Sequence, residues 1–551
     1  MRILALSALL LLPGLARMRA TENTDARYLE ISRAMYASGD WLVPRFAGRP
    51  HLDKPPLTYW AASAGYAALG VTPFAGKLLE QLAVAASALL IGLGGRRWLG
   101  REASFTAALV FLSSGLVFAT SRTLATDLFQ LVFFTGAMLA FWRGVEAPGR
   151  PAAVVLALAL LGASMNAKGP IALFVAASIW LPFLVLLRGH VRVPGRAWAL
   201  GGLLFVLLGA PWYVALSLHD PHQLETWLRV QLLARVSGAS PDIRHLHGPF
   251  YLIGSWPLAL LPWTPLLLLA LWRLRPREGW RRADPLDLYL LLWTLVPLVF
   301  FSIPRSKIAT YLLPGLPGAA FAIARAHATG RLADRAARRA LLASAGLAPG
   351  MALALAAGLL WPARLGSGRF ETELLAARPA FAAALGAAAL LTVVLAVRLG
   401  PPSLRSLRAT ALATGAIYCL GFSAFAPGLA SWRDEGLLAR SVPGSWLLAY
   451  GVTRVSALYY FGDADHYLFA RGISEAERGT GHDEDSVAAT SDEGLALLRR
   501  EEPVFCLTKK RLAPKLIEQT GSREVSRRLG TVLLANPAAQ RALAARTGAA
   551  P

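Results

Sequence analysis

Long apolar segments separated by short polar loops make up most of the chain before residue 428. A helix needs about 20 mainly apolar residues to cross the hydrocarbon core of a bilayer, and these segments have that length. The pattern predicts thirteen membrane-spanning helices, near residues 2–17, 78–95, 104–120, 124–142, 152–166, 169–187, 198–217, 251–271, 286–303, 311–328, 340–360, 379–397 and 409–428. The first resembles a secretory signal sequence, but Arg17 and Arg19 stand where small residues would mark cleavage, so we interpret it as an uncleaved span.

Arginine-rich loops alternate along this pattern. They lie near 96–101, 143–150, 188–196, 273–282, 325–339 and 398–408. Short loops rich in Lys and Arg stay in the cytoplasm. Residues 18–77, residues 218–250 and the chain after 428 are then expected on the other side, which is the periplasm in a Gram-negative cell. The sequence thus predicts a multi-pass protein of the cell inner membrane, with its active site and its C-terminal domain on the periplasmic side.

Two regions outside the predicted bundle have patterns of their own. Residues 18–77 are too polar to span, but Glu30–Ala37 and Pro55–Ala68 have helical and partly aromatic patterns typical of helices that lie in the membrane interface. From 429 to 551, short apolar stretches alternate with polar helical segments, which predicts a soluble α/β domain whose Ala-rich end, 537–551, frays. The predicted fold class is therefore a polytopic α-helical membrane protein with a C-terminal α/β domain.

Composition supports a membrane domain over residues 1–428. Hydrophobic residues make up 55% of the chain and charged residues only 16%, which is more apolar surface than one soluble core needs. The net charge of +23 comes largely from the loop arginines, so it indicates topology against membrane lipid and argues against nucleic acid as a partner. Cys419 and Cys506 form neither a CxxC motif nor a ligand cluster, which leaves a disulfide scaffold and a structural zinc site without support.

Charged residues beside apolar spans are costly, so each needs a partner or a function. The first cluster consists of Asp25, Arg27, Tyr28 and Glu30, shortly after the first predicted span. Two interpretations stay open for it. It is either an Asp N-cap on an interfacial helix, with Arg and Glu on the wet face, or part of a catalytic site.

The second cluster runs from His51 to Pro56, where Lys54 stands directly before two prolines that fix an extended path. An immobilised ammonium at the membrane surface suits the phosphate of a lipid-linked substrate, although a snorkelling lysine gives the same pattern. His51 and Asp53 are ligand types that lie two residues apart, which is a weak signal for a divalent metal ion. The sequence makes no cofactor certain.

Further candidates stand in short loops on the outer side. Asp127 starts a predicted span without a basic residue three or four positions later, so its counter-charge is expected elsewhere in the bundle. Lys168, and Arg305 with Lys307 ahead of Tyr311, lie on the side that is poor in basic residues, which favours a ligand, with snorkelling as the alternative. Such a face suits a polyprenyl-phosphate-linked donor: cations bind phosphate, a carboxylate takes a proton from the acceptor hydroxyl, and an apolar groove holds the lipid chain.

These residues occur in motifs that resemble a known family. The motifs are Asp25-Ala26-Arg27-Tyr28, Ser38-Gly39-Asp40-Trp41, Asp53-Lys54-Pro55-Pro56, Thr126-Asp127, Lys168-Gly169, Pro211-Trp212-Tyr213 and Ser306-Lys307 with Thr310-Tyr311. Together they resemble the aminoarabinose lipid A transferases of the GT-C class, which includes the protein O-mannosyltransferases. The resemblance covers essentially the whole chain.

The resemblance implies that a sugar moves from an undecaprenyl-phosphate carrier to a lipid A, glycolipid or other glycan acceptor, by an inverting displacement with or without a metal ion. The donor sugar stays open between aminoarabinose, galacturonic acid and a neutral hexose. Asp25 and Asp127 are the catalytic candidates. Carried over by position, substrate binding falls to Arg27, Tyr28, Lys54, Lys168, Arg305, Lys307 and Tyr311.

One position departs from the family. The family has an Asp-Glu pair ahead of one residue and Arg-Tyr, whereas this chain has Thr24-Asp25. A Thr hydroxyl cannot serve as a carboxylate base. Either Asp25 or Asp127 takes that role, or the chain is a catalytically impaired protein that binds the lipid carrier. A protein O-glycosyltransferase and a lipid or sugar transporter are further alternatives.

Overall fold

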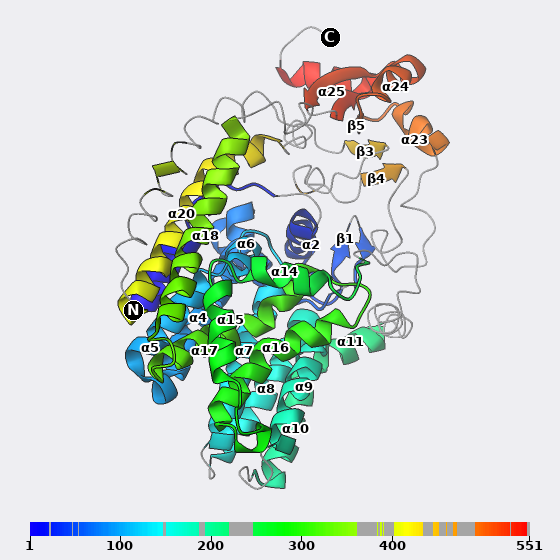
Figure 1. Ribbon diagram of the computed structural model, residues 1–551. Coiled ribbons are helices and arrows are strands. Elements are labelled where there is room, and N and C mark those ends of the chain that lie inside the picture. Colours follow the sequence, from blue (N-terminus) through cyan, green and yellow to red (C-terminus); the bar gives the residue numbers. More distant parts are fainter. Residues whose placement is uncertain are drawn as a thin grey trace.

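The molecule has a long helical bundle at one end and a small mixed sheet at the other (Figure 1). The computed structural model describes residues 1–20, 24–46, 48–52, 54–146, 150–186, 193–219, 246–360, 402–432, 445–450, 467–470, 491–528 and 531–547, with single positions at 383, 386, 387, 390 and 459. The predicted span near 379–397 therefore lies almost entirely outside the described residues.

The first part of the chain forms one short helical segment, an outer region and then the bundle. The elements are α1 (Arg2–Leu11), η1 (Leu15–Arg17), α2 (Thr24–Ser38), β1 (Arg45–Phe46), β2 (Arg49–Pro50), α3 (Leu57–Leu69), α4 (Pro73–Gly94), α5 (Arg96–Leu112), α6 (Gly115–Thr120), α7 (Thr126–Glu146), α8 (Pro151–Lys168), α9 (Ile171–Leu186), α10 (Gly195–Gly209) and α11 (Pro211–His219). The two interfacial helices predicted from the sequence correspond to α2 and α3.

The second part completes the bundle and adds the C-terminal domain. Its elements are α14 (Tyr251–Ala259), α15 (Thr264–Leu274), η3 (Trp280–Arg282), α16 (Pro285–Ser302), η4 (Ala309–Gly315), α17 (Leu316–Ala328), α18 (Arg335–Leu360), α20 (Leu404–Trp432), β3 (Trp446–Tyr450), β4 (Tyr467–Ala470), α23 (Ser491–Leu498), β5 (Val504–Lys509), α24 (Ala513–Thr520), β6 (Arg523–Arg528), β7 (Thr531–Ala535) and α25 (Pro537–Thr547).

By length and composition, α4, α7, α8 and α16 can each cross a membrane, and α10 with α11 and α14 with α15 form two bent pairs that pass the same test together. Within the described residues this makes four spans, or up to six. Local signals explain where several of them begin. Pro stands at the start of α4, α8 and α16, where a helix has no need of the missing N–H, and the side chains of Thr72 and Asp284 accept backbone N–H groups as N-caps.

Several predicted single spans are broken helices. The span near 104–120 divides into α5 and α6 at Ser113, whose hydroxyl donates to Leu109 O at 2.7 Å. The bend is 45° between α10 and α11, and 107° between α14 and α15. Hydropathy does not report these breaks because the residues at them stay apolar, while the missing N–H of Pro211 and Pro262 interrupts the helical hydrogen bonds.

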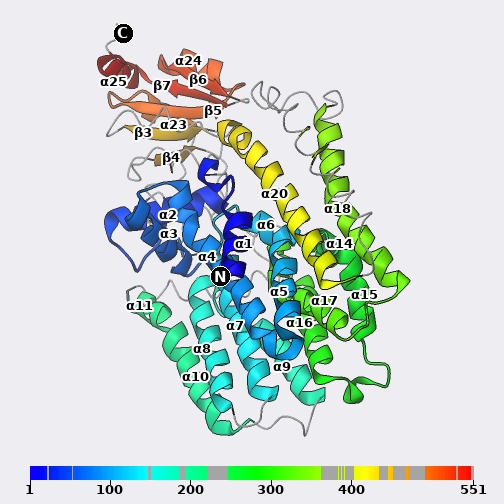
Figure 2. The same ribbon diagram turned by 90° about the vertical axis from the view of Figure 1, so that its left-hand side faces the viewer.

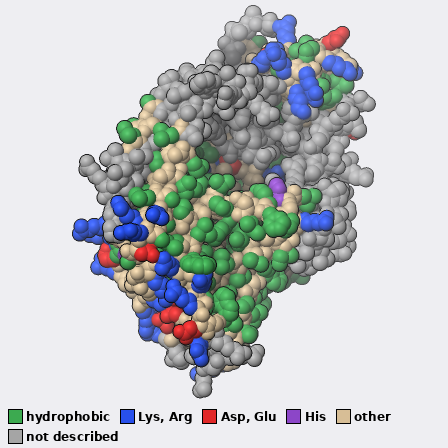
Figure 3. All heavy atoms as spheres, in the orientation of Figure 1, with side chains coloured by type: hydrophobic (Ala, Val, Ile, Leu, Met, Phe, Trp, Pro, Cys, Tyr) green, Lys and Arg blue, Asp and Glu red, His purple; other side chains and the backbone are tan. Residues whose placement is uncertain are grey.

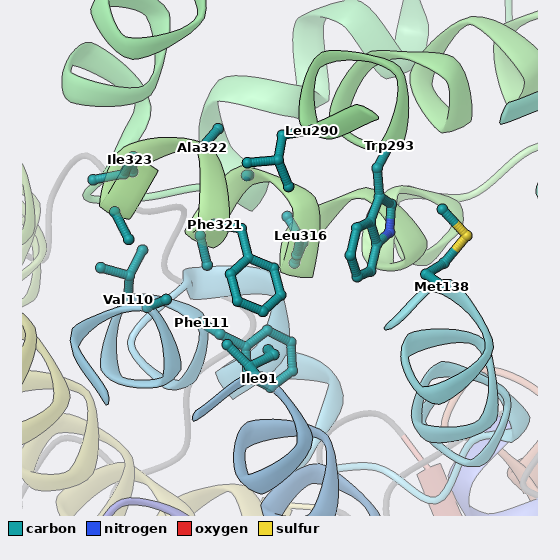
Figure 4. Packing of buried hydrophobic residues seen from close by; sticks show 14 of the residues in the cluster. Ile91, Val110, Phe111, Met138, Leu290, Trp293, Leu316, Phe321, Ala322 and Ile323 are labelled. Atoms are coloured by element: carbon teal, nitrogen blue, oxygen red, sulfur yellow. The ribbon is translucent and has the colours of Figure 1, made fainter. Parts of the chain in front are cut away.

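The core of the bundle is built from large apolar side chains. Phe321 of α17 points toward Phe111 of α5, and Trp293 of α16 lies beside them, as Figure 4 shows. The indole N–H of Trp293 donates to Pro314 O at 2.9 Å, which satisfies its polar group. At the surface, α10 exposes Leu200, Leu203, Val206 and Leu207, a stripe suited to lipid.

The C-terminal domain is a five-stranded sheet with strand order β4-β3-β5-β7-β6. β3 pairs in parallel with β4 and β5, whereas β7 is antiparallel to β5 and β6. Alternate residues along β5 face opposite layers, because Phe505 and Leu507 pack with α25 and Val504 and Cys506 pack with α23 and α24. The predicted α/β character is observed here. The predicted fraying from 537 is wrong as far as Thr547, because α25 is a helix that packs on β5 and β7.

α2 lies between the sheet and the bundle, as both Figure 1 and Figure 2 show, and Figure 2 shows α3 beside it. Buried side chains of α2 and α3, among them Leu29 and Tyr66, share one apolar cluster with Leu447 and Phe505 of the sheet. We call the end of the bundle nearest these helices the sheet end. Figure 3 shows hydrophobic side chains over the middle of one face, basic side chains mainly toward its two ends, and a hollow beneath the C-terminal domain where charged side chains are visible.

Candidate active site

A partly exposed ion pair at the sheet end joins neighbouring helices. Asp127 lies in the first turn of α7, and Lys168 is the last residue of α8. α8 ends there because Gly169 adopts a φ of 78°, a value that favours glycine. Packing of α7 against α8 brings these two helix ends together, with Lys168 Nζ 2.6 Å from Asp127 Oδ1. The counter-charge that the sequence predicts for Asp127 elsewhere in the bundle is Lys168.

Other candidates gather around this pair. The ammonium of Lys168 lies 4.6 Å from the centre of the Tyr311 ring on η4. Lys54 and Thr310 are both close enough to interact electrostatically with the Asp127 carboxylate. The side chains of Asp127 and Lys168 keep 11% and 13% exposure, so a ligand can reach them. A carboxylate, two ammonium groups and a tyrosine ring thus meet on residues that are far apart in the sequence.

Asp25 lies deeper than Asp127. Its Oδ2 is 2.8 Å from Nζ of Lys77 on α4, and its Oδ1 accepts the N–H of Leu124 at 2.7 Å. The side chains of Asp25 and Lys77 are 1% and 0% exposed. An opposite charge and a backbone donor stabilise the charged form of a buried carboxylate. Asp25 as a catalytic residue stays a prediction, and Asp127 is the one of the two that keeps an exposed edge.

Three polar side chains of α4 form hydrogen bonds with the backbone of the segment that leads into α7. They are Lys77, Glu80 and Gln81. Lys77 Nζ donates to Arg122 O at 3.3 Å, and Gln81 Nε2 donates to Ser121 O at 2.5 Å. Glu80 Oε1 accepts the N–H of Ala125 at 2.9 Å. Segment 121–125 is therefore held along its backbone, two residues before Asp127.

The side chain of Arg122 points away from this site. Its guanidinium donates to Leu10 O at 2.9 Å and to Leu11 O, at the end of α1. It also lies 4.2 Å from the Phe118 ring centre and 4.6 Å from that of Phe422. A cation near the last carbonyls of a helix favours its C-terminus, and aromatic faces favour a cation. Arg122 thus links α1 to segment 121–125, whose backbone is bound by side chains of α4.

The structure overturns the interpretation of the first cluster as a wet helix start. α2 begins at Thr24, which is exposed, so Asp25 stands inside the first turn and pairs with Lys77 instead of capping the helix. Glu30 is fully buried and forms a bidentate pair with Arg33, at 2.8 Å and 2.9 Å. Burial raises the pKa of Glu30, and Arg33 opposes that rise. The sequence missed this because Lys77 stands 52 residues from Asp25, and because an i, i+3 pair such as Glu30–Arg33 has the same pattern on a solvent-exposed helix.

The other predicted residues of the first cluster lie nearby on α2. The guanidinium of Arg27 is 6.0 Å from the centre of the Phe46 ring on β1. Tyr28 is buried and meets the ring of Tyr59 edge-on, with centroids 5.5 Å apart. Their roles in substrate binding stay predictions.

Lys307 and Arg305 occupy the segment between α16 and η4. Lys307 is buried, and its ammonium donates to Ser302 O at 2.6 Å and to Gly248 O at 3.3 Å. Burial lowers the pKa of Lys307. Arg305 is exposed, and its carbonyl accepts the N–H of His247 at 3.0 Å. Both residues therefore hold the chain before α14 against the sheet end, and their contact with substrate stays a prediction.

The weak metal site receives no support from the described residues. His51 is buried, and Asp53 lies outside the described residues. In the described part of the chain, no three His, Cys, Asp or Glu side chains come together as a metal site requires.

Sequence reasoning missed Lys77, Glu80 and Gln81. They lie at positions i, i+3 and i+4 of a helix whose other residues are mostly apolar, so they share one face. Polar side chains on one face of a membrane helix point into the protein and mark a partner there. That spacing is the signal that could have identified them.

The chain is similar to known membrane glycosyltransferases. Residues 53–214 match the family model described as dolichyl-phosphate-mannose-protein mannosyltransferase. The chain is 33% identical over 296 residues to the undecaprenyl phosphate-alpha-4-amino-4-deoxy-L-arabinose arabinosyl transferase of Edwardsiella ictaluri, a match over 53% of this chain and 52% of that protein. It is 34% identical over 345 residues to transferase 1 of that description from Sodalis glossinidius, covering 61% and 60%. The chain thus spans about half the length of the first of these relatives.

The solved structures extend the likeness to the whole fold. The crystal structure of ArnT from Cupriavidus metallidurans bound to undecaprenyl phosphate superposes with a TM-score of 0.81, over 100% of this chain and 98% of that one, at 20% identity. The apo structure of the same protein gives the same values. The chain therefore has the helical GT-C fold. These matches confirm the resemblance to the aminoarabinose transferases that was inferred from its motifs.

Proposed function

We propose that the protein is an integral-membrane glycosyltransferase that moves a sugar from an undecaprenyl-phosphate carrier to a lipid A, glycolipid or other glycan acceptor. The observation that carries this proposal is the accessible Asp127–Lys168 pair with Lys54 beside it, at the sheet end of a fold that in another protein binds undecaprenyl phosphate.

The chemistry follows from these groups. The acceptor hydroxyl oxygen attacks the anomeric carbon as the bond from that carbon to the phosphate oxygen breaks, and undecaprenyl phosphate leaves with the electron pair. Asp127 takes the hydroxyl proton, so the carboxylate is a general base at the reacting atoms. Lys54 faces the phosphate and offsets the negative charge that grows on it. Lys168 orients Asp127 through its 2.6 Å contact.

The activity named for the two relatives supports 4-amino-4-deoxy-L-arabinose as the donor sugar. The remaining topology is inferred from the sequence pattern. We infer thirteen spans in the cell inner membrane, with the sheet end and the α/β domain of residues 429–551 facing the periplasm. The arginine-rich loops support this orientation.

The test is a mass comparison of lipid A and surface glycans. Cells that lack the gene receive wild type, Asp127→Asn or Lys54→Ala, and each protein is quantified in the membrane. Wild type is expected to add a sugar mass that both variants lose by about 100-fold or more. Unchanged sugar addition by both variants would refute the assignment.

A second candidate function is supported by Thr24. The family's first acidic position holds this exposed hydroxyl, and the neighbouring Asp25 is buried against Lys77. In this alternative the chain binds the lipid carrier and transfers no sugar. Turnover of a labelled donor by purified wild type and Thr24→Asp separates the two: robust turnover by wild type dismisses the alternative, and turnover only by the variant supports it.

A further inference from the structure

The buried pair of Asp25 and Lys77 has no role in the proposed chemistry. It connects three parts of the chain. Asp25 belongs to α2, Lys77 belongs to α4, and each also binds the backbone of segment 121–125. Asp25 takes the N–H of Leu124, and Lys77 gives a hydrogen bond to Arg122 O.

The same segment is bound again one turn along α4. Gln81 and Glu80 hold Ser121 O and the N–H of Ala125. A backbone whose N–H or carbonyl group is bound at four of five residues has little freedom to shift. Asp127 follows two residues later, at the start of α7.

Removing one charge of a buried pair leaves the other unpaired in a low-dielectric place, which is strongly unfavourable. The chain relieves that cost by moving, and the part most directly bound to both charges is segment 121–125. A displacement there also moves Asp127. The distances from Asp127 to Lys168 and to a substrate hydroxyl determine how well it acts as a general base.

We propose that Lys77 and Asp25 are positioning residues, which fix segment 121–125 and thereby hold Asp127 opposite Lys168. Neither touches the substrate. The kinetic part of this proposal rests on the proposed glycosyltransferase function. The structural part does not, so the two can fail separately.

The structural part is tested by cysteine labelling of the full chain in detergent. Leu124→Cys places a thiol at a site that is fully buried, and a water-soluble maleimide is expected to leave it unlabelled. Adding Lys77→Met is expected to raise the labelling rate about 10-fold or more, because the segment loses its hydrogen bond from Lys77 and Asp25 loses the counter-charge of Lys77. Peptide mass mapping separates the new thiol from the buried Cys419 and Cys506. Equal protection with and without Lys77→Met overturns the proposal.

The kinetic part uses a double-mutant cycle of Asp25→Asn and Lys77→Met. Each single variant is expected to lower kcat about 10- to 100-fold with KM for the lipid-linked donor changed less than about 3-fold, because Lys54 and Lys168 remain. The double variant removes both charges, so it is expected to unfold at a higher temperature than Lys77→Met alone and to lose no more kcat. Near-normal turnover by Lys77→Met beside an inactive Asp25→Asn would instead make Asp25 the base.

Asp287→Asn is the matched control. Asp287 is also buried and paired with arginines, Arg325 and Arg331, but on α16. It is expected to lower the unfolding temperature while kcat stays within about 3-fold of wild type. A loss of kcat equal to that of Lys77→Met would show a general effect of breaking buried pairs and overturn the positioning role. Absence of any turnover in wild type would refute the proposed function and leave the labelling result valid.

Discussion

Lys168 places its ammonium 2.6 Å from the carboxylate of Asp127, a residue 41 positions earlier in the chain. The contact orients the proposed base and offsets its charge. We therefore expect Lys168→Met to lower kcat/KM about 10- to 100-fold, whereas Lys168→Arg, which keeps the charge, loses less. Donor turnover by the purified variants measures this. Equal losses by Met and Arg would show that the site needs the shape of lysine and not its charge.

Glu80 offers a test of how segment 121–125 is held. Its Oε1 accepts the N–H of Ala125, while Oε2 is buried without a hydrogen-bond partner among the described residues. Glu80→Gln keeps the acceptor and removes a potential buried charge, so the unfolding free energy is expected to change by less than about 1 kcal/mol. Glu80→Ala leaves the Ala125 N–H unsatisfied and is expected to cost about 1–3 kcal/mol. Denaturation in detergent compares the two. A larger loss with Gln than with Ala would mean that the ionised carboxylate is required.

Glu30 predicts a pH dependence of stability. Burial raises its pKa above the ordinary value of 4.5 in the folded protein. The folded state then binds the proton more tightly than the unfolded state, so the contribution is fully present below pH 4.5 and is lost as the pH rises through the raised value. The unfolding temperature of Glu30→Gln, measured from pH 4.5 upward, is expected to lack this decline. Parallel curves for wild type and variant would contradict it.

At Gly65, α3 and α4 pack so closely that there is no room for a side chain. A Cβ at this position would lie 2.1 Å from the carbonyl oxygen of Ala75, which is backbone and cannot move aside cheaply. Gly65→Ala is expected to destabilise the fold by about 1–3 kcal/mol. Gly202→Ala is the control, because nothing lies within 4 Å of a Cβ there and alanine favours a helix. Thermal unfolding of both variants measures the difference, and a neutral Gly65→Ala would mean that α3 and α4 separate easily.

Hydropathy and loop charge were sufficient to predict the helical membrane fold, the presence of the helices α2 and α3 before the bundle, and the α/β character of the C-terminal domain. They could not give the broken helices, because the break between α14 and α15 falls within a continuous apolar run. The hydropathy pattern also could not predict β4, because its pairing with β3 depends on the neighbouring strand and not on a local pattern.

The site was partly predictable for a different reason. Asp127 and Lys168 each stand out locally, as charges at the ends of apolar helices, and family motifs contain both. Lys77 stands at the beginning of an apolar helix, where a snorkelling lysine is common, and its spacing from Glu80 and Gln81 indicates a buried face without identifying the partner. Its carboxylate is 52 residues away, and only the packed structure joins them.

The spacing of the Asp25 contacts also has a consequence for synthesis. Asp25 leaves the ribosome 99 residues ahead of Leu124, whose N–H it binds. At about 5–20 residues per second, that interval is about 5–20 s. Through this time the carboxylate lacks the N–H of Leu124. The order of translation therefore makes closure of this contact a late step in biogenesis, after α2, α3 and α4 have been synthesised.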